Sequence, residues 1–349
     1  MIATATTTIA TDKDPRLTLL LNWITTLSDF SLQPATLRAA SADASFRRYF
    51  RIDDADGKSV ILMDAPPPQE DVRPFIQIGQ LLADAGVTVP HILASQVEQG
   101  FLLLSDLGST IYSNRLKQNQ VTTNKLIIDA IDSLIKIQQH SRPDVLPEYD
   151  RAMQMRELML FPEWYIARHL GATLTPAQQT SLDNVFEQIL ANTMAQPQVY
   201  VHRDYHSRNL MVLDEANPGI LDFQGALFGP VTYDIVSLLR DAYIEWDEEQ
   251  VLDWTIRYWE RARKKGLPVS ADIDSFYRDF EFMGLQRHLK ILGIFCRLYH
   301  RDGKAGYLAD LPLVLSYVRK TAQRYNSLIP LLRLLDELEK KTPQVGYTF

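Results

Sequence analysis

The fold is most restricted by the stretch His202-Arg203-Asp204-Tyr205-His206-Ser207-Arg208-Asn209, which is followed after a strand-turn-strand pattern by Asp222-Phe223. Its specified positions have the spacing H-R-D-x-x-x-x-N. Average amino-acid usage produces that spacing by accident on the order of once in a thousand chains of this length. Two carboxylates and an amide in this order offer oxygen ligands of the kind that Mg²⁺ prefers. The pattern therefore predicts a site rather than three unrelated turn residues.

The same spacing is that of the kinase catalytic loop, in which a separate downstream Asp holds metal. Phosphoryl transfer needs positioning and charge neutralisation more than covalent help from the protein. We expect Asp204 to orient an acceptor hydroxyl and take its proton. Asn209 and Asp222 are expected to hold Mg²⁺ with ATP, and His202 to brace the loop as a hydrogen-bonding residue.

The order of elements predicts an α+β protein with a two-lobed protein-kinase-like fold. Residues 1–16 are expected to be a disordered tail, 17–107 a nucleotide-binding lobe, and 108–349 a helical lobe with the catalytic loop and the acceptor site. The small lobe has a β-sheet and one main helix, 69–85, with a further helix at 17–28. Its expected strands are 44–53, 59–64, 87–89 and 101–104. In the large lobe we expect helices at 126–138, 155–170, 176–195, 233–244, 248–264, 273–299 and 313–340, and short strands at 199–201, 209–213 and 219–222.

Composition excludes several other classes of protein. The 349 residues carry a net charge of −7, whereas a nucleic-acid binder normally has a basic face. The single cysteine, Cys296, allows no internal disulfide and no Cys-based zinc site. No apolar run approaches membrane-spanning length, and residues 1–16 lack the apolar segment of a signal peptide. We expect a cytoplasmic protein with a small-molecule partner and no nucleic-acid or membrane partner. The oligomeric state is open, with a monomer slightly favoured.

Two features differ from protein kinases. Gln224 stands where Gly would complete Asp-Phe-Gly, and no Ala-Pro-Glu segment follows. Instead, Gly229-Pro230-Val231-Thr232-Tyr233-Asp234-Ile235 resembles the motif of the aminoglycoside phosphotransferase and choline kinase superfamily. The resemblance implies that Asp234 braces the catalytic loop from the next helix.

Further stretches are similar to the anomeric N-acetylmuramate/N-acetylglucosamine kinases of bacterial cell-wall recycling. They include Asp43-Ala-Ser-Phe-Arg-Arg-Tyr-Phe-Arg51, Gly100-Phe-Leu-Leu-Leu-Ser-Asp-Leu-Gly108, Phe161-Pro-Glu-Trp-Tyr165 and Gln286-Arg-His-Leu-Lys-Ile-Leu-Gly-Ile-Phe295. This resemblance implies ATP-dependent phosphorylation of an anomeric hydroxyl of an amino sugar. The product would be a sugar 1-phosphate for peptidoglycan recycling toward UDP-N-acetylmuramate.

The nucleotide side lacks one expected cation. Kinases carry a strand Lys, as in Val-Ala-Ile-Lys, where this chain has Met63. Arg47, Arg48 and Arg51 on the preceding strand are the replacements to consider, with Arg48 slightly favoured, although all three could be solvated charges. The expected phosphate loop, 41–45, lacks glycines. Ser105 and Leu107 fall where the backbone of a kinase meets adenine.

The acceptor side is predicted from a cationic helical stripe between Gly284 and Lys304. Arg287 and Lys290 on this stripe would suit an acidic acceptor such as the lactyl carboxylate of N-acetylmuramate, although a solvated helix face has the same pattern. Further acceptor-site candidates are Glu163, Trp164, Arg240, Asp241 and Tyr243.

Two alternatives stay open from the residues. The first is a kinase of another hydroxyl acceptor, such as an aminoglycoside, choline or homoserine. The second is a kinase-like binding module without activity, which the missing strand Lys favours and the intact Asp204, Asn209 and Asp222 disfavour.

Overall fold

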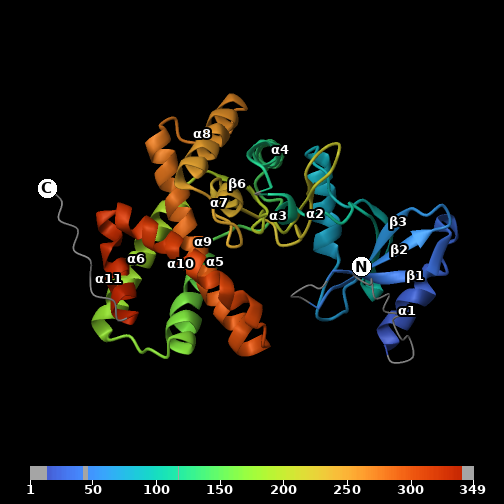
Figure 1. Cartoon of the computed structure of the whole chain (residues 1–349), viewed down its shortest axis with the longest axis horizontal. Helices are drawn as coiled ribbons and strands as arrows, with labels where there is room; N and C mark the ends of the chain where they lie inside the picture. The colour runs from blue at the N-terminus through green and yellow to red at the C-terminus, as the bar shows by residue number, and fades with distance from the viewer. Residues whose placement is uncertain (1–13, 42–45, 117, 340–349) are drawn as a thin grey trace. The chain divides into compact units, whose positions relative to one another are not determined.

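The computed structural model describes residues 14–41, 46–116 and 118–339 (Figure 1). The chain forms two compact units. The first runs to Thr110 and takes in Met211–Gly225, and the second comprises Ile111–Leu210 and the part from Ala226 onward. The segment Met211–Gly225, which was expected in the large lobe, thus belongs to the small unit. Hydrogen bonds explain this, because the Thr88 hydroxyl donates to the Ala216 carbonyl and the Thr88 carbonyl accepts from the Ile220 nitrogen, each over 2.8 Å.

A five-stranded antiparallel sheet forms most of the first unit, in the order β1-β2-β3-β5-β4. Its strands are β1 (Leu32–Ser41), β2 (Arg48–Asp54), β3 (Ser59–Asp64), β4 (Ile92–Gln96) and β5 (Phe101–Ser105). The β2–β3 turn contains Gly57 at a φ of +78°, a conformation that favours glycine. The Asp54 carboxylate accepts from the backbone nitrogens of Asp56 and Lys58, each over 2.9 Å. This is the hairpin that the sequence predicts.

Two helices accompany the sheet, α1 (Pro15–Ile24) and α2 (Arg73–Asp84). Asp14 caps α1 by accepting from the Leu17 nitrogen over 2.9 Å. The apolar face of α1 packs on one side of the sheet in a buried cluster made of Leu17, Leu20, Trp23, Ile24, Phe50, Ile52, Leu62, Phe101 and Leu103. The last residues of the expected tail therefore begin a helix, and residues 1–13 lie outside the described part of the chain.

Helices make up most of the second unit. They are α3 (Tyr112–Arg115), α4 (Gln120–Gln139), α5 (Arg151–Leu158), a π-helix (Phe161–His169), α6 (Pro176–Ala195), α7 (Tyr233–Leu239), α8 (Glu248–Lys264), α9 (Ile273–Asp302), α10 (Leu311–Arg324) and α11 (Ile329–Leu338). Strands β6 (Gln198–Val201) and β9 (Leu227–Pro230) form an antiparallel pair, and β7 (Leu210–Met211) pairs with β8 (Gly219–Ile220). The α+β class that the sequence predicts is confirmed.

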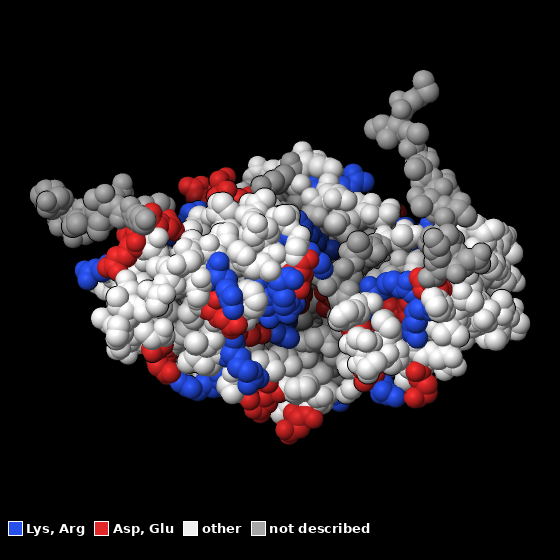
Figure 2. Space-filling view, turned by 90° about the horizontal axis from the view of Figure 1, so that it is seen from below, with Lys and Arg blue, Asp and Glu red and all other residues white. Residues whose placement is uncertain are grey.

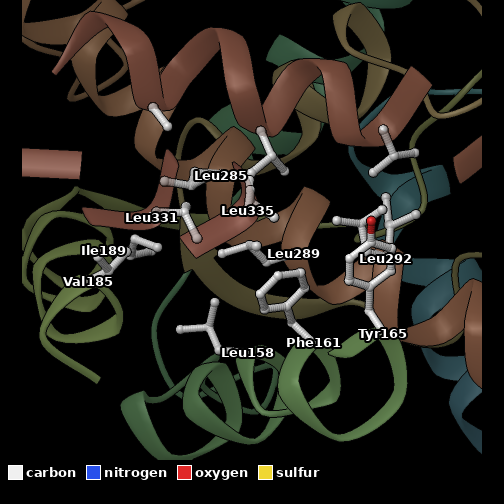
Figure 3. Close-up of a cluster of buried hydrophobic side chains, with 14 of the residues drawn as sticks. Leu158, Phe161, Tyr165, Val185, Ile189, Leu285, Leu289, Leu292, Leu331 and Leu335 are labelled. Carbon is white, nitrogen blue, oxygen red and sulfur yellow. The ribbon is translucent and has the colours of Figure 1, made fainter. Parts of the chain in front are cut away.

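The long helix α9 lies at the centre of the core of the second unit. Figure 3 shows Leu285, Leu289 and Leu292 of α9 among side chains of α5, the π-helix, α6 and α11. Gly293 lets α9 approach this wall, because a Cβ there would lie 2.4 Å from the carbonyl carbon and oxygen of Leu160. Close packing of α9 therefore depends on the missing side chain.

Several predicted elements need correction. Strands β1, β4 and β9 were not predicted from the sequence. Both β1 and β4 are edge strands, and Pro34 in β1 indicated a turn although an edge strand tolerates proline. Val87–Val89 was expected as a strand, but only Thr88 forms a bridge, to Gly219.

Two predicted helices are each divided. The helix expected at 155–170 is α5 followed by the π-helix, and Pro162 lies in the first turn of the latter. The helix expected at 313–340 is α10 followed by α11, with Pro330 in the first turn of α11. Its last residue, Lys340, lies outside the described residues.

The surface shows no dominant charge on the face that Figure 2 displays, where basic and acidic side chains are interspersed. Across the described ranges, each helix is too short or too polar to span a bilayer.

Candidate functional site

The loop His202–Asn209 follows β6, and two buried carboxylates hold its backbone. Asp234 of α7 accepts from the His202 nitrogen over 2.6 Å and from the Arg203 nitrogen over 2.9 Å. Asp241, which follows α7, accepts from the Ser207 nitrogen over 3.0 Å. Burial raises the pKa of Asp234 to about 6, although the charge of His202 and the two backbone hydrogen bonds oppose it. The loop conformation is thus set by residues about 30 positions further along the chain.

Arg203 has a φ of +77°, which is uncommon for a residue with a side chain. Its guanidinium pairs with the carboxylate of Glu157 in α5, which is largely buried. Glu157 also accepts from the Tyr149 hydroxyl. The ion pair with Glu157 helps to hold Arg203 in this strained backbone conformation. Strained residues held by their surroundings are frequent at functional sites.

Asp204 comes next, and its side chain is exposed to solvent. Its backbone nitrogen donates to Nδ1 of His202 over 3.2 Å. Desolvation by the surrounding protein would raise the pKa of Asp204, but the positive charge of Lys290, helped by Arg287, outweighs it and lowers the pKa. The carboxylate is therefore ionised over the neutral range, as a proton acceptor must be.

Asn209 ends the loop, and its amide nitrogen donates to the Asp204 carbonyl over 3.0 Å. Among the described residues, nothing donates to the side-chain oxygen of Asn209. An amide oxygen fixed in this way suits a hard cation.

Asp222 belongs to the first unit, and its φ is +61°. Its Oδ1 accepts from Nε2 of Gln224 over 2.7 Å and from Nη2 of Arg47 over 3.2 Å. The following Phe223 packs against Phe75 of α2, with ring centroids 4.7 Å apart. Within the described ranges, no three His, Cys, Asp or Glu side chains form a metal cluster. A cation held by Asp222 would therefore need further ligands such as phosphate oxygens and water, as Mg²⁺ commonly has.

A cavity of about 140 Å³ in the second unit contains Asp204 in its wall. Its aromatic lining comes from Tyr233, Tyr243, Phe295 and Tyr307. The Tyr243 ring centroid lies 6.0 Å from that of Phe295, and the guanidinium of Arg208 lies 3.4 Å from the Tyr243 centroid. The wall thus offers flat apolar surfaces next to a carboxylate.

Two cations of α9 also line this cavity, and they differ in their partners. Nζ of Lys290 lies 3.0 Å from Oε1 of Glu157 and donates to the Tyr233 hydroxyl over 3.1 Å. Arg287 is only 3% exposed, and in the described part of the chain its guanidinium has no hydrogen bond or ion pair. A buried charge without a partner is costly, so Arg287 is the group here that an acidic ligand would satisfy.

Of the other acceptor-site candidates, Tyr243 lines the cavity and four lie elsewhere. Arg240 is fully buried and forms ion pairs with Glu248 and Glu281, each over 3.2 Å. Glu163 and Trp164 do not line the cavity, and Trp164 packs against the hydrophobic core. Asp241 holds the loop, as described above. These four side chains are therefore structural or exposed here. The sequence could not show this, because helical periodicity does not reveal which face of a helix meets a cavity.

The arginine candidates on the nucleotide side differ in the carboxylates that they contact. Arg48 donates to the buried Asp64 over 2.6 Å and pairs with Asp14, whereas Arg47 contacts Asp222. The Ser105 nitrogen is already bonded to the His91 carbonyl over 2.9 Å, and Leu107 lies two residues beyond. Residues 42–45 of the expected phosphate loop 41–45 lie outside the described residues.

Glu157, Tyr149 and most of the aromatic lining of the cavity were not predicted from the sequence. Glu157 lies on a helix whose pattern is not amphipathic, so nothing in the sequence marked it as buried. Of this lining, Tyr243 was an acceptor-site candidate, whereas Phe295 read as an ordinary core aromatic. Their common position depends on how α9 packs beside the end of α7.

The profile of the phosphotransferase enzyme family matches residues 36–267, which is more than half of the chain. The chain belongs to this family. An N-acetylmuramate/N-acetylglucosamine kinase of Neisseria meningitidis serogroup B is 49% identical to it over 333 residues, covering 95% of this chain and 98% of that protein. The predicted resemblance and the prediction of an enzyme are both confirmed, and the reading as an inactive binding module is not supported.

Solved structures share the fold at low sequence identity. The choline kinase LicA from Streptococcus pneumoniae has a TM-score of 0.63 at 12% identity, covering 87% of this chain and 99% of that one. Amicoumacin kinase hAmiN, solved in complex with AMP-PNP, Ca²⁺ and its ligand Ami, has a TM-score of 0.58 at 16% identity, covering 87% and 96%. These likenesses confirm the predicted kinase-like fold, and the second of these proteins binds AMP-PNP together with Ca²⁺.

Proposed function

We propose that this phosphotransferase transfers the γ-phosphoryl group of ATP to the anomeric hydroxyl of N-acetylmuramate and N-acetylglucosamine. The name of the Neisseria relative supports these two sugars as substrates, because that relative is 49% identical and matched over nearly its whole length. The products would be sugar 1-phosphates, available for transfer to a nucleotide during peptidoglycan recycling. Since ATP is a cytoplasmic substrate, we place the enzyme in the cytoplasm.

The observation that carries this proposal is the buried Arg287 in the same cavity as Asp204. The two sugars differ by one lactyl group, which brings a carboxylate. A guanidinium binds a carboxylate through two parallel hydrogen bonds. Arg287 would thus bind the lactyl group of N-acetylmuramate, and the aromatic wall would contact the apolar face of either sugar.

Phosphoryl transfer then follows from the assigned groups. Asp204 accepts a hydrogen bond from the anomeric hydroxyl and takes its proton while the sugar oxygen bonds to the γ-phosphorus. The bond between that phosphorus and the bridging oxygen breaks, and ADP leaves with the electron pair. Asn209 and Asp222 would hold Mg²⁺, which neutralises the phosphate charge when bound. His202, Asp234 and Asp241 keep the loop in place.

Nucleotide recognition would use the segment that follows β5. The Ser105 nitrogen is engaged with the His91 carbonyl, so we assign the adenine contact to the backbone around Leu107 rather than to Ser105. Of the two residues expected to meet adenine, we therefore keep Leu107 and not Ser105.

Phosphorus NMR of the product tests the function. Incubation with MgATP and N-acetylmuramate should give a new phosphate signal coupled to the anomeric proton. Asp204→Asn should give no product while still binding nucleotide. A signal coupled to another sugar proton would contradict the anomeric assignment, and the absence of any sugar product would contradict the substrate.

A panel of acceptors separates this proposal from other members of the fold class. Arg287 and Lys290 make the cavity cationic, so polycationic aminoglycosides and choline should be poor acceptors. ATP consumption with kanamycin or choline that equals consumption with N-acetylmuramate would favour a different substrate class.

A further inference from the structure

Strand β3 supplies no cation to the nucleotide site. Met63 stands at the place of the kinase lysine, is fully buried, and pairs with Tyr49 of β2 and Leu102 of β5. Kinases need a cation there that is oriented by a helix glutamate and lies near the metal-binding aspartate. A cation that binds the phosphates would therefore have to come from another segment of the first unit.

Arg47, just before β2, lies between two carboxylates of the first unit. Its Nη2 is 3.2 Å from Oδ1 of Asp222, and its Nε is 3.8 Å from Oε2 of Glu70. Oε1 of Glu70 also accepts from the Phe46 backbone nitrogen over 3.3 Å, which fixes the glutamate against this segment. The Arg47 side chain is only 11% exposed, so it is held by the fold and is not a solvated charge.

Arg48 is excluded by its own partners. Consecutive side chains of a strand point to opposite faces. Arg48 lies against the fully buried Asp64, which also pairs with Arg16 over 2.7 Å. Releasing Arg48 to a phosphate would weaken that buried cluster, so the preference for Arg48 drawn from the sequence is reversed.

Asp222 is placed beside Arg47 by packing. Phe223 contacts Phe75 and lies over Gly79 of α2, where an added Cβ would be 3.3 Å from the Phe223 ring. Arg47 and Gln224 both donate to Oδ1 of Asp222, and among the described residues nothing donates to Oδ2. One carboxylate oxygen thus holds side chains while the other is available to a cation.

We propose that Arg47, oriented by Glu70, is the residue that binds the phosphates of the nucleotide in place of the strand lysine. The inference rests on the proposed ATP-dependent function. Nucleotide binding exchanges the Asp222 partner of Arg47 for phosphate oxygens, which a guanidinium can bind through two hydrogen bonds. Because the guanidinium on Oδ1 and a divalent cation on Oδ2 would repel each other and compete for the charge of the same carboxylate, this exchange also strengthens metal binding at Asp222.

Calorimetric titration without any acceptor sugar tests this role. Arg47→Ala should weaken binding of MgADP by about tenfold or more, since a charge-assisted hydrogen bond is lost, and should leave adenosine binding unchanged. Arg47→Lys should recover part of the affinity for MgADP. Glu70→Gln should weaken MgADP binding less than Arg47→Ala does. The control is Arg38→Ala, which removes an exposed pair with Asp53 on the same sheet and should change neither affinity.

The outcomes separate this inference from the proposed function. Unchanged MgADP binding by Arg47→Ala, or an equal loss of MgADP and adenosine binding, would overturn the role of Arg47. Failure of the wild-type protein to bind either compound would overturn the proposed function as well. Titration with Mg²⁺ alone gives a second readout, because Arg47→Ala should bind the ion more tightly than wild type once its competitor for Asp222 is gone. Weaker Mg²⁺ binding by that variant would contradict the competition.

Discussion

The Asp241 carboxylate accepts a hydrogen bond from the backbone nitrogen of Ser207 over 3.0 Å and so holds the middle of the loop that carries Asp204. Asp234 holds the start of the same loop through two backbone hydrogen bonds. The two carboxylates are seven residues apart at either end of α7. This helix therefore acts as the support of the loop, and Asp241 has a positioning role that its sequence neighbours did not indicate.

Asp241→Ala should lower kcat by roughly 10- to 100-fold, because displacement of the loop misplaces Asp204. The KM for the sugar should change little, since Asp241 does not line the cavity. Unpaired backbone nitrogens at Ser207 and Tyr243 should cost about 1–3 kcal/mol in the free energy of unfolding. Steady-state kinetics and urea unfolding measure both effects. Glu163→Ala is the matched control and should change neither the kinetics nor the stability. If Asp241→Ala raised only the KM for the sugar, Asp241 would instead be an acceptor-binding residue.

Asp234→Asn should change the pH dependence of stability. Burial raises the folded-state pKa of Asp234 from 3.8 to about 6, so the folded state binds more protons than the unfolded state between these values. Stability from this group is thus greatest at low pH and decreases as pH rises through 6. The free energy of unfolding of the variant minus that of wild type should therefore become more positive by about 1 kcal/mol between pH 5 and pH 7.5, because only the wild type loses this contribution. Urea unfolding at both pH values measures it, and an opposite or absent trend would show that the carboxylate is ionised throughout.

Arg287→Ala should distinguish the two sugars. We expect KM for N-acetylmuramate to rise about tenfold, through loss of the charged hydrogen bonds to its carboxylate, with little change for N-acetylglucosamine. Lys290→Met is the informative comparison, because Lys290 already pairs with Glu157 and Tyr233. That variant should impair both sugars alike and lower stability. Equal losses for both sugars in Arg287→Ala would remove it from carboxylate recognition.

Gly293→Ala should destabilise the second unit by about 1–3 kcal/mol, as overpacked cores do. The added Cβ would meet the Leu160 backbone at 2.4 Å, and backbone cannot rotate away as a flexible side chain can. Gly306→Ala is the control, since a Cβ there meets nothing within 4 Å. Thermal unfolding of the two variants beside wild type measures the difference, and two equal melting temperatures would show that α9 can shift without cost.

Much of the candidate site was predictable because its residues are close together in the chain. The spacing of His202, Asp204 and Asn209 depends on a single loop, and Asp234 follows within a recognisable motif. The helices and the central hairpin were likewise predictable, since their periodicities of 3.6 and 2 are local properties. The edge strands β1 and β4 were missed because pairing on only one side leaves a weak pattern.

The amino-acid sequence by itself determined the fold class, the family and the identity of the loop, all of which are encoded by residue types at short, fixed spacing. Only the tertiary structure decided which of several similar charges has which role. Arg47 and Arg48 are neighbours, yet Arg47 pairs with Asp222 and Arg48 with Asp64, both far away in the chain. Arg287 and Lys290 lie three residues apart, yet among the described residues only Lys290 of these two pairs with the distant Glu157. The role of a charged side chain depends on the groups that surround it, and packing between distant segments selects those groups.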